Sequence, residues 1–152
     1  MVRLLFDEML KRTATWCRIF GVDSAYIQDV ADNELLKTAK EEGRIVVTRD
    51  EELAERCRTA NVRTILLKND KLEDQLDQLK SELGSIFTFP EKTRCPACNG
   101  ELKIADKEQV KEKVIDNVYK QNEKFWACKE CGKVYWEGSH WKNITKIFKN
   151  IK

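Results

Sequence analysis

The sequence predicts an α/β fold, a parallel sheet with flanking helices, followed by a small module held together by four cysteines. Within residues 1–88, segments typical of strands and of helices alternate four times with short connections, which is the pattern of a parallel sheet. Within residues 89–152, four cysteines form two C-x-x-C pairs, a spacing typical of metal-binding modules. Of the 152 residues, 41% are apolar, enough for a core. We therefore expect two domains, residues 1–88 and residues 89–152.

The first two strand–helix units are expected before Gly43. The apolar run at residues 2–6 is typical of a strand, and a helix over residues 9–20 follows it. Residues 25–27 form a second, weaker strand, and a helix over about residues 33–42 comes next. Inward-facing residues at helical spacing mark these helices, namely Leu10, Ala14, Cys17 and Phe20 in the first and Leu35, Leu36 and Ala39 in the second.

Two further units complete the predicted sheet. Residues 44–47 form the clearest strand of the chain, and residues 62–67 form the last one. Each strand leads into a helix, whose inward residues are Leu53, Ala54 and Cys57 in the third helix and Leu72, Leu76, Leu79 and Leu83 in the fourth. Because Cys17 and Cys57 lie on apolar helix faces, we expect both to be buried, unpaired thiols.

The pattern changes after a linker at residues 85–94. A polar insert around residues 107–114 is predicted to be helical, and residues 125–127 and 133–136 read as a β-hairpin. A final short helix is indicated by four apolar residues at helical spacing, Ile144, Ile147, Phe148 and Ile151.

The strongest local signal is the pair of motifs Cys95-x-x-Cys98 and Cys128-x-x-Cys131. Each can form a tight turn that directs two thiolates at one ion, and two such turns complete a tetrahedral zinc site. Disulfides or redox-active pairs are the alternatives, but two matched pairs without an export signal favour zinc. Because cysteine supplies all four ligands, the Zn²⁺ is expected to be structural and not catalytic.

Aspartates follow several of the predicted strands. Asp7 ends the first strand, Asp50 follows the third, and Asp29 and Asp32 lie in the loop after the second. Because functional groups collect beyond the carboxyl ends of parallel strands, we expect these carboxylates to converge. Oxygen ligands of this kind suit Mg²⁺ or Mn²⁺, which activate water and stabilise charge on a phosphate.

These aspartates have two other interpretations. Any single one is readily explained as a helix cap, but Asp7 and Asp50 at matched strand ends together favour function. A receiver-like phosphoacceptor domain, with Lys68 as its lysine, needs one more strand–helix unit than residues 1–88 offer.

Charge and hydropathy narrow the function classes. Residues 1–88 carry 14 basic and 17 acidic side chains, a balance of −3, whereas residues 89–152 carry 14 and 9, a balance of +5. The basic second half predicts an anionic partner. No apolar run approaches the roughly 20 residues of a membrane helix, so no membrane partner is expected. Charged residues throughout the first twenty argue against a secretory signal, and we expect a cytoplasmic protein.

His140 is the single histidine of the chain, and aromatic residues surround it in the sequence. One interpretation is a histidine packed in a small aromatic core. The other is an RNA contact through stacking or hydrogen bonding. The sequence leaves both open.

Motifs of one known family recur along nearly the whole chain. In the first half they are Phe6-Asp7 with Met9-Leu10, Ala14 and Trp16 with Arg18, Gly21-x-Asp23, Asp29-x-x-Asp32, and Arg44-Ile45 with Thr48-Arg49-Asp50. In the second half they are Arg94-Cys95-Pro96-Ala97-Cys98-Asn99-Gly100-Glu101-Leu102, Phe125-Trp126, Gly132-x-Val134-Tyr135-Trp136 and Gly138-Ser139-His140-Trp141. Together they resemble the Mut-seven C-terminal RNase family, in which a PIN-like nuclease domain precedes a zinc ribbon.

The resemblance implies a PIN-like sheet whose acidic centre binds Mg²⁺ or Mn²⁺ and cleaves RNA. Asp7 and Asp50 match the first-strand aspartate and the Thr-x-Asp aspartate. Asp32 is the expected middle acid, with Asp29 its competitor, and Thr48 would orient Asp50 or a phosphate. The chain departs from the family at three positions, with Glu8 and Lys11 in place of common glycines and Thr15 in place of a frequent arginine.

Two function classes follow from this sequence. The first is a metal-dependent ribonuclease whose zinc ribbon aids RNA binding. The second is a non-catalytic RNA- or ribosome-binding factor with the same fold, and a toxin role and the oligomeric state are left open. The candidate RNA contacts are Arg12, Trp16 and Arg18 on the first helix, and Lys133, His140, Trp141, Lys142 and Lys146 in the second half.

Overall fold

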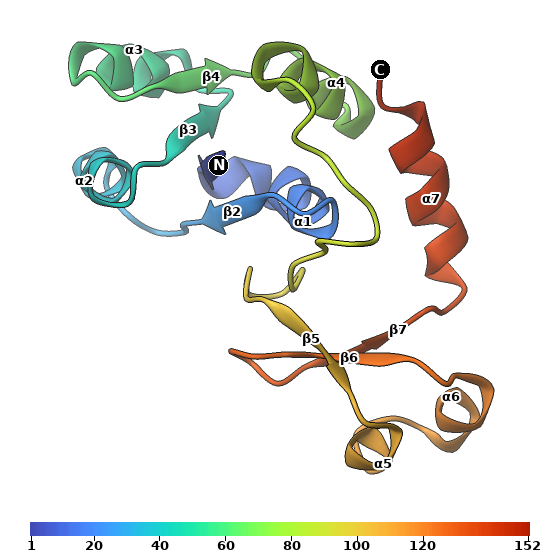
Figure 1. The fold of residues 1–152 in the computed structure, drawn as a ribbon. Helices are drawn as coiled ribbons and strands as arrows, with labels where there is room; N and C mark the ends of the chain where they lie inside the picture. Colours follow the sequence, from blue (N-terminus) through green and yellow to red (C-terminus); the bar gives the residue numbers. More distant parts are fainter.

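The computed structural model describes residues 1–152, and its N-terminal part is built on a four-stranded parallel sheet (Figure 1). The strands are β1 (Arg3–Phe6), β2 (Asp23–Tyr26), β3 (Ile45–Thr48) and β4 (Thr64–Leu66). They lie in the order β2-β1-β3-β4, and every neighbouring pair is parallel. This confirms the α/β fold class, and it places β1 and β3 side by side at the centre.

Helices cover both faces of this sheet because successive side chains of a strand point to opposite sides. Leu4 and Phe6 of β1 belong to one apolar cluster, and Leu5 belongs to another. The first cluster packs under α1 (Lys11–Ile19) and α4 (Leu72–Leu83), and the second under α2 (Asp32–Glu42) and α3 (Glu51–Thr59). The inward residues predicted for the four helices belong to these clusters, except Ala54, and all but Leu36 and Leu83 are buried.

Boundaries differ from the predictions by a few residues. The first helix begins as a 3-10 turn, η1 (Glu8–Leu10), before α1. The second strand starts two residues earlier than expected, at Asp23, and β4 is shorter than predicted. No helix is both long and apolar enough to cross a membrane.

The C-terminal part forms a three-stranded antiparallel sheet in the order β5-β6-β7. The predicted hairpin is present as β6 (Phe125–Cys128) and β7 (Val134–Trp136), and β5 (Leu102–Ala105) is a third strand that the sequence reading missed. The insert contains two short helices, α5 (Lys107–Val110) and α6 (Asp116–Gln121), in place of the single helix expected.

The final helix, α7 (His140–Asn150), follows the three-stranded sheet β5–β7, called the ribbon below, and packs against the first apolar cluster (Figure 1). Ile144 is buried in the cluster under α1 and α4, and the Phe148 ring centroid lies 5.4 Å from that of Phe20. The helix begins at His140, four residues before the start that the apolar pattern predicted. Its apolar side packs against the first cluster because α7 is amphipathic.

A polar joint connects the first cysteine turn to the parallel sheet. Asn99, in the left-handed region at φ 72°, accepts a hydrogen bond from Ser24 N–H at 2.9 Å and donates to Asp23 Oδ1 at 2.7 Å. Arg18 donates to the carbonyl oxygens of Ser24 and Pro96 at 2.8 and 2.9 Å. These bonds join α1, β2 and the cysteine turn.

Asp23 is the charged centre of this joint. Its side chain is 15% exposed, and Arg44 Nη1 lies 2.7 Å from Oδ1. Partial burial raises the pKa of the Asp23 carboxyl, but hydrogen bonds from Asn99 and Arg44 outweigh this and hold the pKa below its ordinary value. Ionised Asp23 therefore stabilises the fold.

We predict that Asp23→Asn lowers the free energy of unfolding at neutral pH by about 1.5–3 kcal/mol, because Arg44 and Asn99 lose a charged acceptor. The depressed pKa means that this stabilisation is complete above pH 3.8 and is lost as the pH falls through the folded-state pKa. The difference between the two proteins should therefore shrink in acid. Urea denaturation at several pH values, with the exposed Asp116→Asn as control, measures it; a difference independent of pH would contradict the prediction.

Candidate functional site

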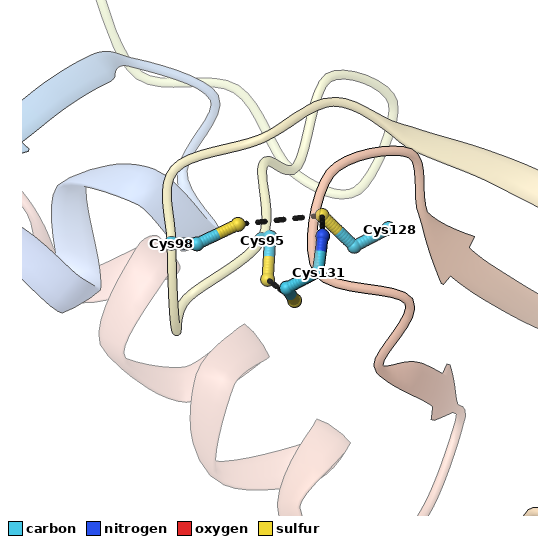
Figure 2. A group of neighbouring side chains, drawn as sticks. All are labelled: Cys95, Cys98, Cys128 and Cys131. Carbon is cyan, nitrogen blue, oxygen red and sulfur yellow. Dashed lines mark hydrogen bonds between the residues drawn. The ribbon is translucent and has the colours of Figure 1, made fainter.

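The four predicted cysteine ligands come together in one cluster (Figure 2). All four Sγ atoms lie within 4.8 Å of one another, with 3.4 Å between those of Cys98 and Cys128 and 3.7 Å between those of Cys95 and Cys131. These distances far exceed the bond of about 2.05 Å in a disulfide. All six cysteines of the chain are free, so the cluster has the form of a metal site that could hold zinc.

The backbone around the cluster suits thiolate ligands. The N–H groups of Glu130 and Cys131 donate to Cys128 Sγ at 3.3 and 3.5 Å, as expected where a tight turn surrounds a metal-bound sulfur. A Cβ at Gly100 would come within 2.8 Å of the same sulfur, which explains why glycine occupies this position. Tyr135 Oη lies 3.0 Å from Cys95 Sγ and adds a hydroxyl donor. The donor set fits Zn²⁺, and because the four thiols fill its tetrahedral coordination, no open position is left for catalysis.

The remaining two cysteines are structural. Cys17 and Cys57 are free and fully buried in the two apolar clusters, which confirms the prediction for both. Burial raises the pKa of each thiol, so neither is expected to be reactive in the folded protein.

The second candidate site lies where the two central strands end. Asp7 follows β1, and Thr48 is the last residue of the neighbouring strand β3. Thr48 Oγ1 donates to Asp7 Oδ2 at 2.5 Å and accepts from Asp50 N–H at 3.0 Å. The buried threonine thus connects the two aspartates expected from matched strand ends.

Asp50 is also the N-cap of α3. Its Oδ1 accepts hydrogen bonds from the N–H groups of Glu52 and Leu53 at 2.9 and 3.3 Å. Both bonds use the same oxygen, so capping does not engage Oδ2. Capping of α3 therefore uses Asp50 Oδ1, and Oδ2 remains available to bind a ligand.

Asp7 has the unusual environment. Its side chain is 7% exposed, and Oδ1 is buried without a hydrogen-bond partner. Burial raises the pKa of this carboxyl, and the nearby charges of Asp50 and Glu8 raise it further, against hydrogen bonds from Thr48 and from the Met9 N–H that lower it. A buried, unpaired carboxylate oxygen is costly, and a proton or a divalent cation could satisfy it.

The other acidic residues divide between two positions. Asp32, in the first turn of α2, forms an exposed ion pair with Arg56 of α3 at 3.1 Å. Asp29, at φ 59°, directs its N–H toward Glu8 Oε2 at 3.5 Å. The pKa of the Tyr26 hydroxyl is raised by desolvation and then by the charges of Glu8, Asp7 and Asp29. No three carboxylates have oxygens gathered as closely as the four thiols.

The candidate RNA contacts also fall into different environments. Arg12 is exposed on α1, whereas Trp16 packs at the edge of the core, with its ring centroid 5.6 Å from that of Phe20. Arg18 is only 8% exposed, and its bonds to backbone carbonyls make it part of the polar joint. In the second half the remaining candidates are exposed or half-buried, namely Lys133, His140, Trp141, Lys142 and Lys146.

A comparison with protein-family models gives one match. The model described as Mut7-C RNAse domain covers residues 2–148, which includes both sheets, the cysteine cluster and most of α7. No curated protein and no solved structure matches the chain.

We predict one zinc ion per chain, held by Cys95, Cys98, Cys128 and Cys131. Elemental analysis should find it in the wild type and in Cys17→Ala, and should find little in Cys98→Ser. Chelation should release β5–β7 to hydrogen exchange while β1–β4 stay protected, because a module this small depends on its ion. Zinc-free protein with an unchanged exchange pattern would contradict this.

A separate prediction concerns Asp7. Asp7→Asn should stabilise the metal-free protein by about 1–3 kcal/mol, since it removes a buried charge that has negative neighbours and one unpaired oxygen. Added Mn²⁺ should raise the thermal midpoint of the wild type but not that of Asp7→Asn. The exposed Asp74→Asn serves as control. If Mn²⁺ shifts neither protein, Asp7 is not a metal ligand.

Proposed function

The chain belongs to the Mut7-C RNAse domain family, and we propose that it is a metal-dependent ribonuclease whose acidic centre lies at the carboxyl edge of the four-stranded sheet. The observation that carries the proposal is the buried Oδ1 of Asp7, which has no hydrogen-bond partner in the chain, in a carboxyl that Thr48 connects to Asp50. Natural proteins retain such costly groups mainly where they function.

In the proposed mechanism, Asp7 and Asp50 hold Mg²⁺ or Mn²⁺, and Thr48 fixes the orientation of both through its hydroxyl. The bound ion would supply an activated water and compensate charge on the scissile phosphate. The proteins' own contribution is preorganisation: two strand ends and one helix N-terminus keep the carboxylates in place before RNA arrives.

The third acid of the centre has three candidates. Asp32 fits the family pattern, and its ion pair with Arg56 is exposed and therefore worth only about 0–1 kcal/mol, so that pair is easily exchanged for a metal. Asp29 and Glu8 are the other two, and the Asp29 N–H is directed toward Glu8 Oε2 at 3.5 Å. We keep Asp32 as the middle acid and Asp29 as its competitor.

The division of labour follows the charge division. We propose that residues 1–88 cut RNA and that residues 89–152 hold it. The second part keeps a balance of about +3 when zinc and four thiolates, together −2, are included in its balance of +5. Six free cysteines fit a reducing compartment such as the cytoplasm.

One observation favours a second candidate function, a non-catalytic RNA- or ribosome-binding factor. No three carboxylates meet within ligand distance, and Asp32 is engaged by Arg56. A protein of this kind would keep the fold, the zinc and RNA binding without turnover. Cleavage separates the two candidates.

We predict that Asp50→Asn lowers Mn²⁺-dependent cleavage of single-stranded RNA by at least about a hundred-fold, a typical loss when a charge-stabilising group is removed. Asparagine is an equally good N-cap, so α3, the fold and the zinc content should persist. Initial rates on a labelled RNA, with Asp74→Asn as the matched control, measure the effect.

Two results would contradict the assignment. Cleavage that survives in Asp7→Asn and in Asp50→Asn would locate the activity elsewhere or in a contaminant. A pure wild-type protein that binds RNA but never cuts it with Mg²⁺ or Mn²⁺ would favour the non-catalytic factor.

A further inference from the structure

A cavity of about 390 Å³ lies between the ribbon and α7, away from the acidic edge. Its walls come from distant parts of the chain: the segment around Phe89, the face of the three-stranded sheet, and the first turn of α7. The volume is within the range of about 300–1,000 Å³ typical of small-ligand sites. Neither the acidic centre nor the cysteine cluster uses this cavity.

Aromatic rings form much of its lining, which also includes Glu91. Ile104, Trp126 and Tyr135 stand directly opposite one another across β5, β6 and β7, so they share one face of the sheet. The rings of Trp126 and Trp141 are stacked, with centroids 6.1 Å apart and planes 19° from parallel. Trp136 also lines the cavity, and its ring packs against no other aromatic ring. Ile104 is another lining residue, and it is 82% exposed.

The same helix that closes the cavity carries a one-signed charge. Lys142, Lys146 and Lys149 are all exposed and are spaced four and three residues apart, so they form one stripe along α7. Residues 138–152 contain four lysines and no acidic residue. His140, Trp141 and Ile144 of this helix line the cavity, whereas the lysine stripe projects from the other, exposed side of α7, beginning one residue after Trp141.

We propose that this cavity, the aromatic pocket, binds one unstacked base of single-stranded RNA while the lysine stripe of α7 holds the adjoining phosphates. The proposal rests on RNA being the substrate class, and it assigns the holding site. Flat aromatic walls suit stacking with any base, and exposed lysines suit backbone phosphates. A protein segment would explain the apolar walls but not a helix whose exposed charges are all positive.

The test measures binding without added Mg²⁺ or Mn²⁺, so that its result does not depend on cleavage. Two probes are used, a single-stranded oligouridylate and an abasic ribose-phosphate chain of the same length. Trp136→Leu should weaken oligouridylate binding by about five-fold to a hundred-fold and leave the abasic probe unaffected, because only a base can stack. Alanine at Lys142, Lys146 and Lys149 should weaken both probes and flatten the salt dependence.

Two further variants keep the test decisive. Tyr119→Leu removes a ring of α6 outside the pocket and should change neither probe. The exposed His140→Ala should give a smaller, base-dependent loss even if Trp136→Leu fails to fold, which its zinc content would reveal. If both Trp136→Leu and His140→Ala bind oligouridylate like the wild type, or lose both probes equally, the proposal is wrong. An inactive enzyme that shows the base-dependent loss would leave the pocket standing and remove only the ribonuclease assignment.

Discussion

The structure depends on the contact between the first cysteine turn and the edge of the parallel sheet. β2 is an edge strand, and an edge leaves backbone groups in need of partners. Asn99 supplies one by accepting from Ser24 N–H, and Arg18 joins the same strand to Pro96 O. The turn that presents these groups is shaped by its cysteines. Metal binding therefore also fixes the groups that partner the edge of β2, although the residues lie about 75 positions apart.

The acidic edge shows the opposite balance between stability and function. At the joint, Asp23 is surrounded by donors, and its charge stabilises the fold. At the strand ends, Asp7 is buried with one oxygen unpaired and negative neighbours, so its charge destabilises the chain on its own. Ionised Asp23 therefore stabilises the fold and ionised Asp7 destabilises it, because Asp23 has cationic neighbours and Asp7 has only acidic ones.

Local patterns predicted the elements, and the cysteine spacing predicted the cluster, because both depend on neighbours in sequence. The features that local patterns did not indicate were set by distant partners. β5 alternates Lys103 with Ile104 in a charged segment, and only pairing with β6 reveals it as a strand. Arg18 looked like a surface cation, yet carbonyls from β2 and the cysteine turn bury it. The ion pair of Asp32 with Arg56 spans two helices, and no local pattern indicates it.

The return of α7 to the first core gives the ribbon an unusual status. The chain leaves the core after α4, forms the second sheet, and is anchored again by Ile144 and Phe148. The three-stranded sheet β5–β7 is thus an insertion anchored to the first core at both ends, and not a free terminal segment. When it opens, its two ends stay where they were, so it gains less conformational entropy than a free terminal segment would. In the locally unfolded state this segment is a loop whose two ends are held at a fixed distance. The four thiolates therefore stay close together, which favours rebinding of the metal ion.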